Sequence, residues 1–560
     1  MGVPGLWPEL NKHEVAENKS MASLAREFLE RVGRPIRLAV DGNLWGFHNK
    51  GGKGGYNPDK RTFYYRLCKM MNLGICAIFV YDGPQKPSFK RNKVISPIQP
   101  AEVRWMIDLI EKLGFQTRIA PGEAEAECAY LQKMGAVDYV VSDDVDVFIF
   151  GATKVITNWN REKRKANKSA SEKSTSASTI PVQIYKMDTV KEKTGLDIPG
   201  MVLIALMSGG DYDTKGVLKC GSHVSIEAAK AGYGAKLIGC GYNRDKTEDW
   251  KQQLIEALHS NSKKEFTTRH KALKLEAEFP DEQVVRNYLD PIVSNSTVID
   301  WNGKVDINGL YEFVHAELKH GSYRFIRYLA PSILIQQIAN GDGSNVIAVH
   351  DSKIRVQSDG IELRISYVPS QVIEIELPND DSDSSSQTDE TVGSSMTDTK
   401  SSKRSNDEPA RIWILEPIAR MPLKDKISEW QKRQAAKAVK KKRVPAQENT
   451  ILSYLKPIKP HGTNTSTRRL QYDHISQVSK GEENKHSKSD KPRRLSPINL
   501  INSNVSSSPP LSSKSNNEII DLASSSPLAA DSIGSHVRVL MPASKQSSIN
   551  SQYDYVELSD

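Results

Sequence analysis

Residues 36–41 (IRLAVD) and 77–82 (AIFVYD) are two short apolar runs, each ending in an aspartate, and they decide the fold class. Further strand candidates are 115–120 (FQTRIA), 137–141 (VDYVV) and 145–150 (VDVFIF). Between them, the apolar residues of 100–113 recur every three or four positions and Gly114 ends the run, which predicts a helix. Strands that alternate with helices predict an α/β fold with a mostly parallel sheet covered by helices on both faces.

The chain is too long for one ordinary core, and its charge is unevenly distributed. It has 560 residues, of which 38% are hydrophobic, and a formal net charge of +9. Residues 411–500 hold 21 basic and 8 acidic residues, whereas 371–410 hold 3 basic and 10 acidic residues. We therefore expect several folded units, a polyanion-binding arm and a solvated acidic linker.

Shifts in pattern divide the chain into five expected segments. They are a strand–helix region at 1–155, a basic Ser-rich loop at 156–180, a helical region at 181–345, a small β+α module at 350–435 and a disordered basic, Ser-rich tail at 436–560. In the module, strand-like runs at 354–356, 361–365, 372–377 and 412–415 precede a helix near 427–430. A Ser/Asp-rich insertion interrupts it at 380–408. The last 60 residues include 17 serines, which is typical of disorder.

Cysteine usage and hydropathy limit where the protein works. The five cysteines form no C-x-x-C pair, so we expect neither a disulfide framework nor a zinc finger, but a reducing compartment. No apolar run reaches 18 residues and the N-terminus MGVPGLWPEL lacks a signal-peptide core. We therefore expect no membrane partner.

Acidic residues gather where the predicted strands end and helices begin. The candidates are Asp41, Asp82, Glu123, Glu125, Asp143, Asp144, Asp146 and Asp211. In a parallel sheet the carboxyl ends of the strands share one edge, so this spacing predicts a carboxylate cluster in one cleft. Mutual repulsion there is relieved by divalent cations, and a Mg²⁺ pair suits phosphodiester cleavage. No His/Cys set with zinc spacing competes.

Each acidic group also has a plainer interpretation. A single aspartate after a strand often forms a turn or a helix cap, and the glutamates of EAEAE suit a solvated first helical turn. Glu123 and Glu127 share a helix face whereas Glu125 points elsewhere, so local geometry does not select the ligands. On an extended strand Asp144 and Asp146 would point the same way, which makes Asp143 a spare or a helper.

The ordered motifs resemble the XPG-like, flap-endonuclease superfamily of structure-selective nucleases. Across about 1–235 they are MGVPGLW, LAVDGNLW, FVYDGPQKPSFKRNK, APGEAEAECAYL, VSDDVDVFIFG and LMSGGDYDTKGVLKCG. The resemblance implies a PIN-like nuclease core that uses two Mg²⁺ ions, with Mn²⁺ as a substitute, and leaves 5′-phosphate and 3′-hydroxyl ends. The implied metal ligands, which are also the catalytic carboxylates, are Asp41, Asp82, Glu123, Glu125, Asp144, Asp146 and Asp211.

The same resemblance implies residues that handle DNA. Lys90 and Arg91 would steady the scissile phosphate, and Lys86 and Lys93 would contact DNA beside them. The remaining candidates are Gly2 and Trp7 as a wedge on which a base pair stacks, and Gly216, Lys219 and Gly221 in a helix–two-turn–helix that holds K⁺ against a duplex phosphate. The plainer interpretations are a loop of surface lysines, a core tryptophan and an ordinary helical hairpin.

The interval between Asp82 and Glu123 bears on substrate choice. It spans 41 positions, too few for a helical arch that threads a free 5′ end or for a long acidic spacer. A short, open gateway suits a four-way junction and favours the Gen/Yen-type Holliday-junction resolvases, especially their filamentous-fungal forms.

Residues 350–435 resemble the chromodomain of those forms. We expect a monomer that pairs on the junction, makes paired symmetrical nicks and also cuts 5′ flaps, in recombination and repair. The alternatives are a 5′-flap endonuclease without junction resolution and an inactive junction-binding scaffold.

The tail holds short motifs. The basic run 432–443 predicts nuclear import, with non-specific DNA binding as the alternative. Residues 448–455 resemble a sliding-clamp peptide and 519–522 resemble a SUMO-interaction strand. Serines in Ser-Pro pairs, at 496, 508 and 526, are candidate phosphorylation sites. We expect a nuclear protein.

Overall fold

A computed structural model describes most of the chain up to residue 443. The described residues are 2–47, 56–87, 89–90, 93–94, 101–159, 180–355, 358–373, 375 and 405–443; of these, the side chains of 47, 89–90, 93–94, 101–102 and 440–443 are not described. Most of the predicted loop at 156–180, the Ser/Asp-rich insertion and the whole tail with its clamp, SUMO and Ser-Pro motifs lie outside these residues.

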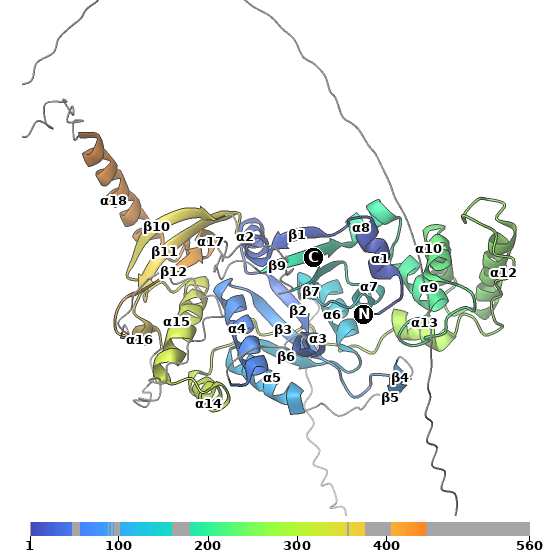
Figure 1. The fold of residues 1–560 in the computed structure, drawn as a ribbon, viewed down its shortest axis with the longest axis horizontal. Helices are drawn as coiled ribbons and strands as arrows, with labels where there is room; N and C mark the ends of the chain where they lie inside the picture. Colours follow the sequence, from blue (N-terminus) through green and yellow to red (C-terminus); the bar gives the residue numbers. More distant parts are fainter. Residues whose placement is uncertain are drawn as a thin grey trace, which may run out of the picture. The chain divides into compact units, whose positions relative to one another are not determined.

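A seven-stranded, mostly parallel sheet forms the centre of the fold (Figure 1). Its strands are β1 (Glu17–Ser20), β2 (Arg37–Asp41), β3 (Cys76–Tyr81), β6 (Gln116–Ile119), β7 (Tyr139–Val141), β8 (Lys154–Thr157) and β9 (Pro181–Lys186). They lie in the order β1-β9-β8-β7-β2-β3-β6. The pairs from β8 to β6 are parallel, whereas β9 pairs antiparallel with β8 and with β1.

Helices cover both faces of this sheet. The first set comprises α1 (Leu6–Lys12), α2 (Met21–Val32), α3 (Gly42–Phe47), α4 (Pro58–Asn72), α5 (Ala101–Lys112), α6 (Ala124–Lys133), α7 (Asp146–Ile149), α8 (Met187–Thr194) and α9 (Ile198–Ser208). Alternate residues of β2 enter different cores: Leu38 and Val40 pack with α2, α4 and α5, whereas Ala39 packs with α1, α6, α7 and α9. The period-two burial follows from the strand geometry and confirms the predicted α/β class.

A helical lobe follows the sheet in the chain. It contains α10 (Ser222–Lys230), α11 (Tyr233–Gly239), α12 (Arg244–Ser260) and α13 (Glu282–Leu289). Two further helices, α14 (Ile307–Leu318) and α15 (Ser322–Ala339), return to the sheet side, where α15 packs beside α4. The helix α9 connects sheet and lobe. Asp197 caps its N-terminus, since the Asp197 side chain accepts a 3.0 Å hydrogen bond from the amide of Gly200.

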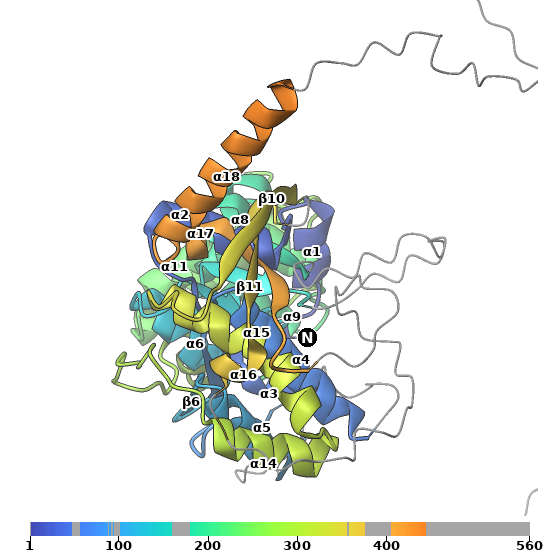
Figure 2. The same ribbon diagram turned by 90° about the vertical axis from the view of Figure 1, so that its left-hand side faces the viewer.

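A second, three-stranded antiparallel sheet lies after α15. Its strands are β10 (Ala348–Arg355), β11 (Gly360–Tyr367) and β12 (Ala410–Leu415), and its helices are α16 (Pro369–Val372), α17 (Glu416–Ala419) and α18 (Lys424–Arg443). Figure 2 shows α18 running past β10 and extending beyond the sheet. Arg433 of α18 donates a 3.3 Å hydrogen bond to the carbonyl of Val349. A β+α element therefore stands where the module was expected, while its chromodomain character stays a prediction.

Three local predictions were wrong. The run 145–150 contains the short helix α7 (Asp146–Ile149) and no strand, since a brief apolar run does not distinguish the two. The segment from 181 is not entirely helical, because β9 begins it. Within 372–377, Val372 ends the helix α16.

None of the described helices combines the length and hydropathy that spanning a bilayer requires.

Candidate active site

Neighbouring strands bring the first acidic residues to one edge of the sheet. Asp41 ends β2 and lies opposite Val80 of β3, and Val40 lies opposite Val141 of β7. Asp82 follows β3 and Ser142 follows β7, so all three lie at adjacent carboxyl ends of parallel strands. This is the edge at which α/β sheets bind ligands.

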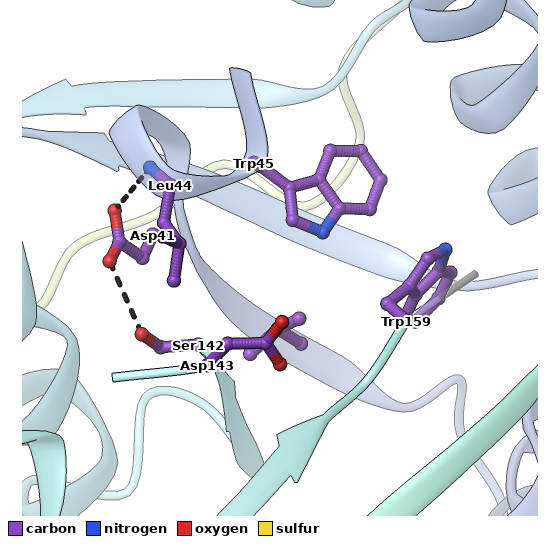
Figure 3. A pocket seen from close by; sticks show the side chains of 7 residues that line it. Asp41, Leu44, Trp45, Ser142, Asp143 and Trp159 are labelled. Atoms are coloured by element: carbon purple, nitrogen blue, oxygen red, sulfur yellow. Dashed lines mark hydrogen bonds between the residues drawn. The ribbon is translucent and has the colours of Figure 1, made fainter. Parts of the chain in front are cut away.

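Asp41 is buried and its carboxylate is held by two donors. The amide of Leu44 donates to Oδ1 at 3.1 Å and the hydroxyl of Ser142 donates to Oδ2 at 3.2 Å (Figure 3). Burial, with repulsion from the carboxylates of Asp82 and Asp144, raises the Asp41 pKa to about 7 against the two hydrogen bonds that lower it. A cation placed here would therefore stabilise a carboxylate that this environment disfavours.

The start of α6 brings a second group to Asp82. The amide of Ala124 donates a 3.0 Å hydrogen bond to Asp82 Oδ1, and Lys86 Nζ lies 3.5 Å from Oδ2. Glu123 is buried at the N-cap of α6 and accepts a hydrogen bond from the hydroxyl of Tyr212. Glu125, in the first turn of α6, is partly exposed.

Glu127 belongs to a structural ion pair. Its fully buried carboxylate accepts a 3.0 Å hydrogen bond from Arg118 and two from Ser294, one from the amide at 2.7 Å and one from the hydroxyl at 2.5 Å. These partners compensate a charge that would be costly to bury alone. Of the glutamates in EAEAE, the arrangement therefore leaves Glu123 and Glu125 as the candidate metal ligands.

Asp143 and Asp144, which follow β7, have different hydrogen-bond partners and point to different sites. Asp144 is buried; its amide donates to Ser142 Oγ at 3.1 Å, and its Oδ1 accepts a 3.3 Å hydrogen bond from the amide of Asp146. Asp143 instead accepts a 2.6 Å hydrogen bond from the amide of Asn158 and lines a small pocket with Trp45 and Trp159. In Figure 3 its carboxylate points away from Asp41. Asp144 and Asp146 are brought together by a turn into α7, not by an extended strand.

The N-terminal segment closes against this pair of aspartates. The amide of Val3 donates a 3.2 Å hydrogen bond to Asp146 Oδ1. A Cβ atom added at Gly2 would lie 2.2 Å from Asp146 Oδ1 and 2.4 Å from Asp144 Oδ1, and the φ of Gly2 is +87°. Only glycine fits this position without displacing a carboxylate.

Asp211 and the turn after it start the helical lobe. Asp211 is buried and follows the glycine pair that ends α9. Gly216 has φ +56°, and an added Cβ would lie 2.5 Å from the amide nitrogen of Gly209, so this glycine packs the turn against the end of α9. Lys219, with φ +65°, is exposed, and Gly221 is exposed before the first residue of α10.

The other predicted DNA contacts are placed only in part. Trp7 is partly buried, with its ring 5.2 Å from that of Tyr185 and 6.2 Å from that of Phe148, so it packs on the core. Lys90 and Lys93 lie in the short hairpin β4 (Phe89–Lys90) and β5 (Lys93–Val94), with side chains outside the described part. Arg91 lies outside the described residues.

The donor set fits divalent cations with oxygen ligands. Five of the seven predicted ligands are buried carboxylates, namely Asp41, Glu123, Asp144, Asp146 and Asp211. Within the described ranges, no three acidic, histidine or cysteine side chains already have the spacing of a metal site. The fit therefore rests on ligand chemistry, the shared edge and the raised Asp41 pKa, not on a preformed coordination geometry.

Two supporting side chains were missed by the sequence reasoning. Ser142 links Asp41 to Asp144, and Tyr212 links Glu123 to the segment that carries Asp211. Each lies directly beside a quoted acidic residue, in VSDD and GGDY, so proximity in the motif was the available indication.

Comparison with known proteins places this geometry in a family. Residues 114–211 match the family model described as the XPG I-region. The crystal structure of the Holliday junction-resolving enzyme GEN1, in complex with product DNA and a Mg²⁺ ion, aligns over 77% of this chain and 99% of its own, with 31% identity and a TM-score of 0.62. The chain belongs to the XPG-like nuclease family.

Curated relatives of this XPG-like chain match it over only part of their own length. The DNA repair protein RAD2 of Saccharomyces cerevisiae is 27% identical over 240 residues, which are 43% of this chain and 21% of RAD2. Flap endonuclease GEN-like 1 of Arabidopsis thaliana is 28% identical over an alignment of 233 residues that covers 35% of this chain and 36% of that protein. The XPG-like chain therefore matches about a fifth to a third of these relatives' lengths.

Proposed function

We propose that this chain is a structure-selective DNA endonuclease that resolves four-way junctions by paired symmetrical nicks and also cuts 5′ flaps. The observation that carries the proposal is the carboxylate edge, at which Asp41, Asp82 and Asp144 are close enough for the latter two to raise the Asp41 pKa. The solved GEN1 structure with product DNA and Mg²⁺ supports the same reaction class.

The reaction is hydrolysis of a phosphodiester by water, giving a 5′-phosphate and a 3′-hydroxyl. Two bound Mg²⁺ ions, replaceable by Mn²⁺, would activate the water and neutralise the leaving oxygen. The ligands would be Asp41, Asp82, Glu123, Glu125, Asp144, Asp146 and Asp211. Ser142 and Tyr212 orient Asp41 and Glu123, and Lys86 offsets the charge of Asp82.

Residues around the edge would hold the substrate. Lys90 and Arg91 would contact the scissile phosphate, with Lys93 beside them. Gly2 lies next to Asp144 and Asp146. The lack of a side chain at this position would let DNA come close to the edge. The core packing of Trp7 favours a structural role that fixes α1, with base stacking limited to its exposed part.

The turn from Gly216 to Gly221 is our candidate for a duplex-phosphate contact that uses K⁺. A solved GEN-1 structure binds potassium. In this chain the exposed Lys219 and Gly221 precede α10, whose N-terminus favours an anion. Backbone carbonyls of the turn would supply oxygen ligands to the cation.

The short interval between Asp82 and Glu123 favours four-way junctions, and not flaps threaded by a free 5′ end, as substrates. Between Asp82 and Glu123, the described elements are only the hairpin β4–β5, the helix α5 and the strand β6. A junction without free ends needs an open path to the carboxylate edge. Two opposed cuts need two sites, so we infer a dimer on the DNA, working in the nucleus.

End-labelled four-way junctions and 5′ flaps, incubated side by side with protein and Mg²⁺ or with EDTA, test the proposal. We expect Mg²⁺-dependent cuts on opposed junction strands with ligatable ends. Cutting of flaps alone would make the protein a 5′-flap endonuclease. Junction binding without any cleavage would make it a scaffold.

A further inference from the structure

We propose that the loop of residues 262–275, called here the basic loop, is a second contact surface for duplex DNA. It rests on the proposed function, since the duplex is an arm of the same branched substrate. The basic loop is the first part of the connection between α12 and α13, which spans residues 261–281; the later part of that connection holds the exposed Glu276 and Glu278. The basic loop lies outside the carboxylate edge and the turn before α10.

The basic loop has a strong excess of exposed positive charge. Its five exposed cations are Lys263, Lys264, Arg269, Lys271 and Lys274. None of them forms an ion pair with a described residue. The single acidic side chain, Glu265, accepts a 3.1 Å hydrogen bond from the hydroxyl of Tyr233. The five positive charges are therefore available to a polyanion.

The charged positions are held by a fixed backbone. From 261 to 281 there is no helix or strand, and connections longer than about 15 residues without one are usually functional or disordered. This loop is anchored: Phe266 and Leu273 are buried in the core, and Asn261 bonds both the amide and the carbonyl of Phe266. His259 Nε2 lies 2.8 Å from the carbonyl oxygen of Leu273. Anchoring lowers the entropy cost of ordering the loop on a ligand.

The basic loop lies beside the helix that begins at the proposed phosphate contact. The amide of Thr267 donates a 3.0 Å hydrogen bond to Glu227 of α10. Glu227 comes five residues after Ser222, the first residue of α10, or about 7.5 Å along the helix axis. Figure 1 shows α12, which leads into the loop, on the outer side of the helical lobe beyond α10. One duplex arm can therefore lie across both surfaces.

The chemistry of the loop selects a phosphate backbone over a protein. All large apolar side chains of the loop face the core, and none is among the exposed hydrophobic residues. Lysine and arginine side chains without an aromatic or apolar platform bind phosphates without reading bases. We therefore expect contacts that depend on duplex length and salt but not on sequence.

The test compares the full-length protein with the triple variant Lys263→Gln, Lys264→Gln, Arg269→Gln. The control variant Lys133→Gln, Lys154→Gln, Lys304→Gln removes the same charge from exposed positions; Lys133 ends α6 and Lys154 begins β8, at the opposite edge of the sheet. Binding of four-way junctions with short and long arms is measured against salt concentration, with Ca²⁺ in place of Mg²⁺ to prevent cleavage. Thermal unfolding checks that each variant is folded.

For the loop variant, we expect the plot of log K against log salt to become less steep, by about 0.9 for each lost phosphate contact. We also expect the Kd for junctions with long arms to rise about tenfold or more at 0.15 M salt. Short arms that end before the loop should show no such change, and single-turnover cleavage at saturating protein should be unaltered. An unchanged slope, or the same loss in the control variant, would overturn the inference. Absence of cleavage by the wild-type protein, with the binding difference intact, would refute the proposed function alone.

Discussion

The backbone amide of Val3 donates a 3.2 Å hydrogen bond to Oδ1 of Asp146, which lies 143 positions later in the chain. This contact fixes the N-terminal segment against the end of the parallel sheet. Since the neighbouring Asp144 Oδ1 accepts a hydrogen bond from the amide of Asp146, backbone groups orient both carboxylates before any ion is bound.

Replacing Gly2 by alanine should damage the proposed metal site. The new Cβ would lie 2.2 Å from Asp146 Oδ1, so the carboxylates must move. We expect the cleavage rate at subsaturating Mg²⁺ to fall about tenfold or more and the Mg²⁺ requirement to rise, as measured by single-turnover assays across a Mg²⁺ titration. Gly135→Ala is the matched control, because Gly135 also has a left-handed φ of +75° but has no atom within 4 Å of an added Cβ. Equal effects of the two substitutions would show that conformational strain, not carboxylate displacement, is responsible.

Asp144→Asn and Asp143→Asn should separate the two adjacent aspartates. Asp144 is buried beside Asp41 and Asp146, whereas Asp143 bonds the amide of Asn158 and points away from Asp41. We expect Asp144→Asn to lower the single-turnover cleavage rate by about 100-fold or more, because a proposed metal ligand is lost. Asp143→Asn should lower this rate by less than about tenfold. Asp144→Asn also removes a buried negative charge that repels the carboxylate of Asp41. We therefore expect the melting temperature of this variant to be no lower than that of the wild type. Similar losses in both variants would assign Asp143 to the ligand set.

Arg118→Met should destabilise the fold by leaving the buried carboxylate of Glu127 without its cation, with only the hydrogen bonds from Ser294 remaining. Removing one partner of a buried pair typically costs about 3–5 kcal/mol. Chemical denaturation gives the free energy of unfolding, and the double variant Arg118→Met, Glu127→Met should recover part of the loss. The exposed pair Arg286–Glu282, at 2.7 Å, is the control, and Arg286→Met should change stability far less. A small effect of Arg118→Met would mean that Ser294 alone satisfies Glu127.

Stability should fall in mildly acidic solution because of His320. Burial, followed by the positive charges of Arg324 and Arg61, lowers its pKa from 6.5 to about 3. The unfolded chain then binds the proton more readily, so the His320 contribution is intact above about pH 6.5 and is lost as the pH falls toward 3, by up to about 1.4 kcal/mol per pH unit. Urea unfolding between pH 7.5 and 4.5 should show a steeper loss for the wild type than for His320→Phe. The exposed His223→Gln is the control, and parallel pH profiles for wild type and His320→Phe would contradict the assignment.

The sequence predicts the fold class well because two features indicate the same parallel sheet. These are the spacing of the hydrophobic residues and the acidic residues at the ends of the predicted strands. Four predicted strands of the parallel sheet correspond to β2, β3, β6 and β7. The polar edge strand β1 (ENKS) has no hydrophobic alternation and is defined by pairing with β9. β9 does bury Val182 and Ile184 alternately, so its period was readable and was overlooked.

The sequence predicts which acidic residues form the candidate site. It predicts much less well how their side chains are arranged and which partners they bind. Strand ends place Asp41 and Asp82 on one edge, and the helix start places Glu123 beside them. Whether Glu127 is a ligand depends on Arg118 and on Ser294, which is 167 residues away, and no local pattern contains that contact. Likewise the pairing of Asp144 with Asp146 arises from a turn into α7, which the apolar run 145–150 concealed.

The central claim is best tested on a supercoiled plasmid that extrudes a cruciform, incubated with the full-length protein and Mg²⁺. Two opposed cuts within one junction lifetime give linear plasmid with a ligatable nick in each hairpin end. A single cut instead relaxes the cruciform and gives nicked circles. We predict that linear product forms directly, and that Asp144→Asn abolishes it. Nicked circles alone, or cleavage that persists in Asp144→Asn, would contradict a junction-resolving nuclease built on this carboxylate edge.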